Sequence, residues 1–299
     1  CEDLGKAFNM FFKGINKYPN FKSKKQQKDS CRFFRKNEYT LQIKDNNFLK
    51  LSGFPFMIKM KEELKINGII KEITLSRKAD KYFASFIVDS DINFKPIKNN
   101  KYVGVDLGIK TLAVCNDSDD LTNEYKSIIK DLVPLYKQID YYNKRMSKKD
   151  RTSNRYNVMK TKLQRIYLKI SNTQKDYIHK ITTSLIKSYQ YITIEDLSIS
   201  NMIKNRKLSK TISRSLFYSF RMFLEYKALR YGNTIIKADR WFPSSQICSA
   251  CGQVLEGKDK LKLSDRTYKC SCGNEIDRDI NAAINLKLYG MRQVGLQPK

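Results

Sequence analysis

Apolar residues follow a helical spacing at the start of the chain and a strand-like alternation after it. The helical spacing predicts an amphipathic helix over residues 3–16 that ends near Pro19. Between residues 31 and 90 the apolar residues fall in short runs, which are typical of β-strands. These runs are CRFFR, YTLQI, FLKL, PFMIKM, GIIKEITLS and KYFASFIVD, and a polar turn at 77–80 joins the last two. Short strands separated by turns predict a small β-barrel or sandwich.

The rest of the chain has the pattern of an α/β domain. KYVGVDLG at 101–108 predicts a buried strand, and KTLAVC predicts its hairpin partner. Residues 121–190 are predicted to be largely helical, with a loop at 148–154 that divides them into a helical hairpin. A buried strand YITIE, a basic helix from about 209 to 231 that stops at Gly232, and a strand NTIIKAD follow.

The charge balance indicates a polyanionic partner. The 299 residues include 58 Lys and Arg against 30 Asp and Glu, which gives a formal net charge of +28. Basic side chains gather at 17–36, 141–170 and 201–230, with Tyr and Phe between them, as a surface that binds phosphates and stacks bases requires. A solvated basic surface is the simpler alternative for any one stretch. Nucleic acid is the expected partner.

The sequence also predicts where the protein is located and the roles of its remaining cysteines and its tryptophan. No window holds the ~20 continuous apolar residues that span a bilayer, so no membrane partner is expected. The chain opens with Cys rather than Met, has no signal-peptide pattern, and is interpreted as a fragment or processed form. A cytoplasmic location is expected, because four of the seven cysteines cluster in the manner of metal ligands. Cys1, Cys31 and Cys115 are expected to be packing residues. Trp241 is expected in the core, with a base-stacking role as the alternative.

Three carboxylates occupy positions from which they could converge. Asp106 ends the strand YVGVD, Glu195 ends YITIE, and Asp279 begins a helix that continues through NAAINL. Acidic side chains are rarely buried unless they are paired or bind a cation, and converging carboxylates suit Mg²⁺ or Mn²⁺. Two such ions can activate water and stabilise the leaving oxygen of a phosphodiester.

Simpler interpretations exist for each carboxylate taken alone. Asp106 could be a turn or cap residue, and Glu195 could begin a loop. Asp277 and Asp279 could favour the positive end of the final helix. Other chemistries lack their components. His179 is the only histidine and is expected to be a packed helix residue, so a Ser-His-Asp triad is poorly supported. No phosphate-binding G-x-x-x-x-G-K-[ST] loop is present.

Four cysteines predict a structural zinc site. The pairs are Cys248–Cys251 and Cys270–Cys272, and a glycine follows each pair. Four thiolates suit tetrahedral Zn²⁺ and leave no open position for water. The second pair has one intervening residue where zinc ribbons usually have two. The alternative is four buried free cysteines.

These motifs, in this order, resemble the transposon-encoded TnpB family, which is related to the compact type V CRISPR effectors. The matching stretches are KYPNFKSKK, VGVDLGIKTLAV, DYIHKITTSLI, ITIEDLSI, FLEYKALRYGNTII, WFPSSQICSACG and RTYKCSCGNEIDRDINAAINL. The resemblance implies an α/β RNase H-like (RuvC) domain, with an inserted helical hairpin and zinc ribbon, preceded by a small β-barrel that resembles a wedge domain. It also implies an RNA-guided DNA endonuclease, whose partners are a guide RNA from the element and target DNA.

By this resemblance, Asp106, Glu195 and Asp279 are the catalytic Mg²⁺ or Mn²⁺ ligands of the three RuvC motifs, and Asp277 and Arg278 support them. The implied domains are a remnant of a helical recognition segment at 1–30, the wedge-like part at 31–98, a RuvC domain split into 99–246 and 275–299, and the ribbon at 247–274. A monomer is expected.

The chain departs from the family in its N-terminal part, which is short. That departure keeps a second hypothesis open, namely a nucleic-acid-binding accessory or regulatory protein of the transposon without useful nuclease activity. A third, a stand-alone zinc-ribbon DNA-binding protein, explains the cysteines but leaves the three carboxylates unexplained.

Overall fold

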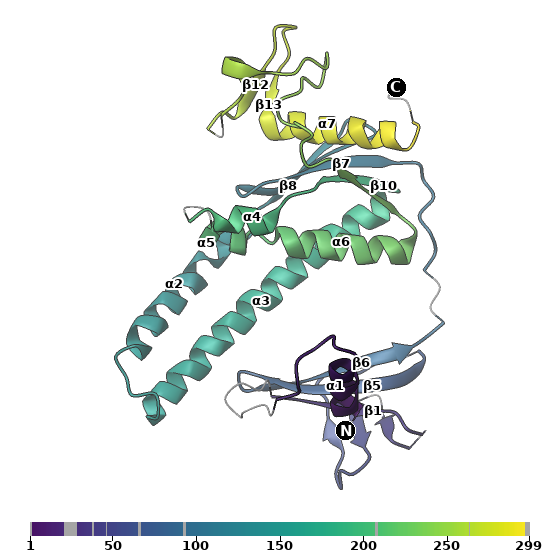
Figure 1. Ribbon diagram of the computed structural model, residues 1–299, viewed down its shortest axis with the longest axis vertical. Helices are drawn as coiled ribbons and strands as arrows, with labels where there is room; N and C mark the ends of the chain where they lie inside the picture. Colours follow the sequence, from purple (N-terminus) through teal and green to yellow (C-terminus); the bar gives the residue numbers. More distant parts are fainter. Residues whose placement is uncertain are drawn as a thin grey trace. The chain divides into compact units, whose positions relative to one another are not determined.

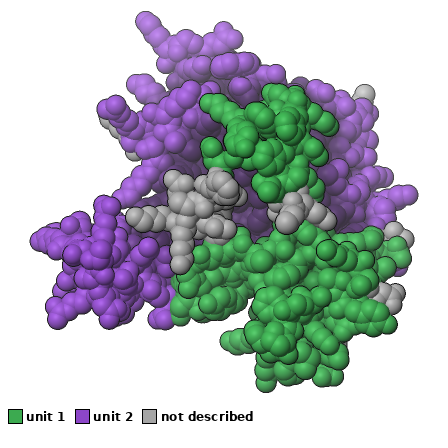
Figure 2. Space-filling model, turned by 60° about the horizontal axis from the view of Figure 1, so that its bottom comes forward, with its two compact units in different colours: residues 1–92 green, residues 93–299 purple. Residues whose placement is uncertain are grey.

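The computed structural model describes residues 2–20, 29–37, 39–45, 47–64, 67–91, 94–206, 209–262 and 264–296 (Figure 1). The chain divides into two compact units, residues 1–92 and 93–299, coloured green and purple in Figure 2. Each unit is described by itself.

The first unit begins with helix α1 (Glu2–Phe12). The helix predicted over 3–16 is therefore present but ends earlier than Pro19. Gly14 adopts a left-handed φ of 70°, and its N–H and that of Ile15 donate to the carbonyls of Phe11 and Met10. This glycine terminates the helix, because a left-handed residue satisfies the last carbonyls and turns the chain away from the axis.

Two three-stranded sheets form the rest of this unit. One has the order β1 (Ser30–Phe34), β5 (Ile69–Lys78), β6 (Lys81–Asp89), and the other β2 (Leu41–Lys44), β3 (Phe48–Leu51), β4 (Ile58–Lys59). All of their pairings are antiparallel. Both sheets contribute to one core, which contains Leu41, Leu49, Leu51, Ile70 and Ile73. The six predicted strands are confirmed. In the described part of the unit no strand pairing joins the two sheets, so the arrangement is that of a small sandwich.

The second unit is an α/β domain, as predicted, built on a five-stranded sheet of order β11-β10-β7-β8-β9. Its strands are β7 (Tyr102–Leu107), β8 (Thr111–Asp117), β9 (Thr122–Lys126), β10 (Tyr191–Glu195) and β11 (Thr234–Ala238). β10 runs parallel to β7 and β11, and β8 and β9 are antiparallel to their neighbours. Helices α3 (Asn154–Ser188) and α6 (Phe217–Tyr231) cover one face, and α7 (Arg278–Gln293) covers the other (Figure 1).

Two helical predictions for this unit need correction. The predicted helical stretch 121–190 contains the edge strand β9 before the hairpin of α2 (Ile129–Met146) and α3. The polar sequence of β9, TNEYK, lacks the apolar alternation of a half-buried strand. The predicted basic helix 209–231 is divided into α5 (Ser209–Arg214) and α6, because Leu216 adopts a left-handed φ of 67°. The short α4 (Ile199–Lys204) was not predicted.

Glycines let α7 approach the sheet closely. A Cβ on Gly104 of β7 would clash with the carbonyl oxygen of Ala283 and the amide nitrogen of Lys287, both of the α7 backbone. At the other end of the helix, a Cβ on Gly290 would clash with the Thr193 hydroxyl of β10. The helix that carries Asp279 therefore packs closely on both strands, backbone against backbone at Gly104 of β7 and against the Thr193 side chain of β10 at Gly290.

Candidate metal centres

Asp106 and Glu195 lie at the same edge of the sheet and on the same face. β7 and β10 are parallel neighbours, and Val105 pairs with Ile194, so Asp106 and Glu195 are the next residues of the two strands. Side chains alternate between faces along a strand. Gly104 and Thr193, two residues before the two acids, contact α7, so both carboxylates lie on the face that α7 covers.

Asp279 is in the first turn of α7 and reaches the same region. Its charge is among the influences that raise the pKa values of Asp106 and Glu195. Asp277 caps the helix, since its Oδ1 accepts from the N–H groups of Asp279, at 2.8 Å, and Ile280, at 3.3 Å. The simpler interpretation, a helix-favouring acid, therefore fits Asp277. The carboxylate of Asp279 is beside Arg266, with Nη1 to Oδ2 at 3.9 Å.

The protein disfavours the charged forms of Asp106 and Glu195. Burial raises the pKa of Asp106 well above its ordinary value, and the charges of Glu195 and Asp279 raise it further. Burial also raises the pKa of Glu195, against the opposing effect of a hydrogen bond from Ser244 and of Arg278. A bound cation would relieve this cost, because it favours the ionised carboxylates. The donor set therefore fits a hard divalent ion.

The carboxylates converge without closing into a tight shell. Among the described residues, the four cysteines are the one group of three or more potential ligands whose donor atoms all lie within 4.8 Å of one another. A divalent ion would therefore have to draw the three carboxylates closer together.

Several polar residues around the carboxylates were not predicted. The Ser244 hydroxyl donates to Glu195 Oε1 at 2.6 Å, and Asp196 accepts from Arg221 at 2.8 Å and from Arg240 at 2.9 Å. Asn281 and Asn285 are buried in α7. Their spacing of four residues inside an otherwise apolar helix face was the available sequence signal, while Ser244 offered none.

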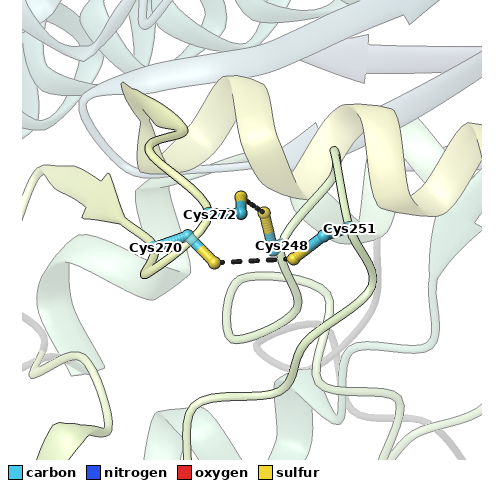
Figure 3. Close-up of side chains that lie close together, drawn as sticks. All are labelled: Cys248, Cys251, Cys270 and Cys272. Carbon is cyan, nitrogen blue, oxygen red and sulfur yellow. Dashed lines mark hydrogen bonds between the residues drawn. The ribbon is translucent and has the colours of Figure 1, made fainter.

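The four cysteines meet as predicted (Figure 3). Their pairs are crossed between the two loops: Sγ of Cys248 lies 3.7 Å from Sγ of Cys272, and Sγ of Cys251 lies 3.6 Å from Sγ of Cys270. A Zn–S bond of about 2.3 Å in a regular tetrahedron separates two sulfurs by about 3.8 Å. The single residue between Cys270 and Cys272 is therefore compatible with zinc geometry.

The thiols also have the electrostatics of a zinc site. Burial disfavours the Cys248 thiolate, but backbone N–H groups of Cys251 and Ala250 and the side chain of Asn274 outweigh it and lower the pKa of Cys248 to about 6. The backbone N–H of Asn274 lowers the pKa of Cys272, but the Cys270 and Cys251 side chains outweigh it and raise that pKa to about 12. Four adjacent thiolates require a cation. Strands β12 (Thr267–Lys269) and β13 (Glu275–Asp277) form the small hairpin beside the cluster.

The predicted basic clusters have different outcomes. Within 17–36, residues 21–28 fall outside the described part of the chain. The 141–170 cluster forms the tip of the α2–α3 hairpin, where a cavity of about 340 Å³ is lined by Tyr141, Tyr142, Arg145, Arg155 and Lys162 among others.

No described helix is long and apolar enough to cross a membrane.

Three single-residue predictions can also be compared. Trp241 is 85% exposed, so its assignment to the core was wrong: it follows β11 in a loop where Asp239 Oδ1 accepts from its backbone N–H. Cys115 is buried in the core, as expected, whereas Cys31 is exposed on β1. Cys1 lies outside the described residues. His179 stacks on Phe223 at 4.2 Å between ring centroids, which agrees with a packed helix residue.

Two family profiles together match most of the chain from residue 85 to residue 286. The family profile "Probable transposase" matches residues 85–206, and "Cas12f1-like, TNB domain" matches 217–286. A Streptomyces pristinaespiralis protein, "Putative RNA-guided DNA endonuclease", is 32% identical over 96% of this chain and 69% of its own length. "Putative RNA-guided DNA endonuclease InsQ" of Escherichia coli K12 is 28% identical over 97% of this chain and 72% of its own.

Among solved structures, the complex of Cas12f1 with its guide RNA and target DNA has a TM-score of 0.46 at 18% identity. That alignment covers 72% of this chain and 55% of the other, so the chain spans about half of that protein. More distant viral relatives are named TnpB-like proteins. The identity and coverage of the Streptomyces relative, with the transposase profile, decide the assignment: this chain belongs to the TnpB family.

Proposed function

We propose that this chain is a divalent-metal-dependent DNA endonuclease guided by RNA, and that Asp106, Glu195 and Asp279 hold its catalytic ions. The relatives named RNA-guided DNA endonucleases support the activity. The observation that carries the site is the placement of Asp106 and Glu195, desolvated on adjacent parallel strand ends and facing the helix of Asp279. Such a group is costly unless it binds a cation.

Each side chain would have a separate task. The charges of both other carboxylates act on Asp106, so it would hold the metal together with Glu195 and Asp279. Glu195 is oriented by Ser244, and Asp279 approaches from α7. Two ions held in this way would supply activation of water and stabilisation of the leaving oxygen. These residues would belong to a split RuvC-type domain of 99–246 and 275–299, with the ribbon at 247–274.

Arg278 is placed to bind the substrate phosphate. Its positive charge acts on both Asp106 and Glu195, and its Nη1 donates to the carbonyl of Lys262 at 3.1 Å. Its buried Nε has no hydrogen-bond partner among the described residues. A guanidinium pairs well with phosphate, so Arg278 would be a favourable donor to a phosphate oxygen of the scissile strand.

Charge supports RNA and DNA as the partners. The net charge of +28 and the basic, tyrosine-containing tip of the α2–α3 hairpin suit phosphates and unpaired bases. The cysteine cluster would hold a structural Zn²⁺, since all four positions are thiols. The sandwich of the first unit would take the place of the wedge-like domain.

The test is cleavage of supercoiled plasmid and single-stranded DNA with Mg²⁺, by chain purified with and without co-expressed element RNA. Wild type is compared with Asp106→Ala, and with Asp119→Ala as a control, because Asp119 is an exposed acid paired with Lys101 in a turn after β8. We expect RNA-dependent cleavage that is lost only in Asp106→Ala. Cleavage by Asp106→Ala at the wild-type rate would contradict the site. RNA binding without cleavage by the wild type would instead favour the accessory-protein hypothesis.

A further inference from the structure

Two buried asparagines of α7 hold the first cysteine loop of the ribbon. Asn281 and Asn285 are 0% and 3% exposed, and one helical turn separates them, so they share a face of α7. Asn281 Nδ2 donates to the carbonyl of Ile247 at 2.7 Å, and its Oδ1 accepts from the N–H of Ser249 at 3.0 Å. The amide of Asn281 therefore binds the backbone on both sides of Cys248.

Asn285 extends this connection to the carboxylates. Its Nδ2 donates to the carbonyl of Ile247 at 2.7 Å and to that of Ser244 at 2.8 Å. Ser244 is 4% exposed, and its hydroxyl donates to Glu195 Oε1 at 2.6 Å. An unbroken path of hydrogen bonds and covalent bonds thus joins Cys248 to Glu195.

Helix α7 also carries the third carboxylate, Asp279. Asp279 is two residues before Asn281, and Ala283 holds α7 against Gly104 of β7, two residues before Asp106. α7 therefore contacts the cysteine loop through its asparagines and the sheet through its small residues. A displacement of the cysteine loop would be transmitted to Asp279 through the helix and to Glu195 through Ser244.

We propose that Asn281 and Asn285 are positioning residues that couple zinc binding in the ribbon to divalent-metal binding by the three carboxylates. This inference rests on the proposed function, because it requires that the carboxylates bind a metal ion. Zinc fixes the backbone around Cys248, and the asparagines transmit that fixed position to α7 and Ser244. Coupling between two sites is reciprocal, so a divalent ion at the carboxylates should also strengthen zinc retention.

A merely structural role for these asparagines predicts a different result. Asn281→Leu would remove the acceptor of the Ser249 N–H, and Asn285→Leu would remove the donor to the Ser244 carbonyl, so both substitutions should lower stability. The matched control is Asn233→Leu, because Asn233 Nδ2 likewise donates to two carbonyls, those of Ile186 at 2.8 Å and Tyr189 at 2.6 Å, at the start of β11. If the substitutions only lower stability, the folded forms of Asn281→Leu, Asn285→Leu and Asn233→Leu should all bind Mn²⁺ with the wild-type affinity.

The experiment measures the affinity of the full chain for Mn²⁺ by electron paramagnetic resonance, with zinc content checked in each preparation. Loss of residues that orient metal ligands typically weakens metal binding about 10–100-fold. We expect about 10-fold weaker Mn²⁺ binding in Asn281→Leu and Asn285→Leu, and the wild-type affinity in Asn233→Leu. Zinc depletion should weaken Mn²⁺ binding by wild type to a similar extent, and weaken it little further in Asn285→Leu. In wild type, Mn²⁺ should slow the release of zinc to a chelator.

Wild-type Mn²⁺ affinity in both zinc-loaded leucine variants would overturn the inference, as would equal weakening in Asn233→Leu. If the leucine variants do not fold, Ser244→Ala decides, because it removes only the hydroxyl that reaches Glu195: unchanged Mn²⁺ binding would again overturn the inference. Asp106→Asn separates the two proposals. If it binds Mn²⁺ as wild type does, the carboxylate site itself is wrong. If it abolishes binding while the asparagine variants do not weaken it, only the coupling fails.

Discussion

Substitution of Gly104 by alanine should damage the carboxylate site without touching a carboxylate. The new Cβ would lie 3.0 Å from Cα of Lys287 and closer still to the carbonyl oxygen of Ala283. Both atoms belong to the α7 backbone, so no side-chain rotation can relieve the clash. Strand and helix must separate by about 1 Å to restore a normal contact.

The expected magnitudes follow from that displacement. Overpacking of this kind typically costs about 1–3 kcal/mol, and each kcal/mol lowers the Tm of a unit of this size by roughly 2–4 °C. Because β7 carries Asp106 and α7 carries Asp279, the distance between the two carboxylates must also change. A misplacement of about 1 Å can lower a catalytic rate by about 100-fold. The assays are thermal unfolding by circular dichroism, Mn²⁺ binding, and DNA cleavage at a temperature where the variant is folded.

Gly290→Ala is the matched control, because its Cβ would clash with the Thr193 side chain rather than with backbone. The second substitution Thr193→Ala should therefore recover most of the stability lost in Gly290→Ala, whereas the clash at Gly104 has no such remedy. If Gly104→Ala has the Tm, the Mn²⁺ affinity and the cleavage rate of wild type, the close packing of α7 does not determine the site.

Other predictions concern the charges, the zinc and the exposed tryptophan. Asp106→Asn should raise the Tm of the metal-free protein at pH 7.5, by roughly 3–5 °C for each unit by which burial and neighbouring charges raise the pKa of Asp106. The gain should vanish near pH 4, because a carboxyl whose pKa is raised in the folded state destabilises the protein only as the pH rises above the pKa of that carboxyl in the unfolded state. A Tm of Asp106→Asn below that of wild type at pH 7.5 in EDTA would contradict this prediction. The chain should bind one Zn²⁺ through its cysteine cluster, and Cys270→Ser should release it faster to a colorimetric chelator; equal release would exclude Cys270 as a ligand. Trp241→Ala should change the free energy of unfolding by less than about 0.5 kcal/mol, yet weaken single-stranded DNA binding about 10-fold if bases stack on it; a large loss of stability would contradict its exposure.

The sequence pattern was sufficient for the strands that are buried on one or both faces. YVGVD and YITIE predicted β7 and β10, and their final acids predicted which residues would share one sheet edge. β9 escaped prediction because an edge strand needs little apolar surface, and its partner β8 stabilises it through the backbone. The left-handed residue Leu216, which separates α5 from α6, gives no local signal, because leucine strongly favours helix.

The sequence indicated the candidate ligands but not the residues that support them. Cysteine spacing and carboxylate placement are local properties that a linear sequence displays. The contact of Ser244 with Glu195 joins residues 49 positions apart, and that of Asn285 with Ser244 joins residues 41 apart. Such contacts depend on how α7 packs on the sheet, which single residues do not encode. Trp241 was misassigned for a related reason, since a lone aromatic residue does not indicate whether it faces the core or the solvent.

The central claim is that Asp106, Glu195 and Asp279 bind divalent ions together, and the most direct test is diffraction from crystals of the zinc-loaded chain soaked in Mn²⁺, recorded at the manganese absorption edge. We predict manganese peaks contacted by carboxylate oxygens of all three residues, and their loss in crystals of Asp106→Asn. Peaks confined to other acidic side chains, with the three carboxylates unoccupied at saturating Mn²⁺, would contradict the account.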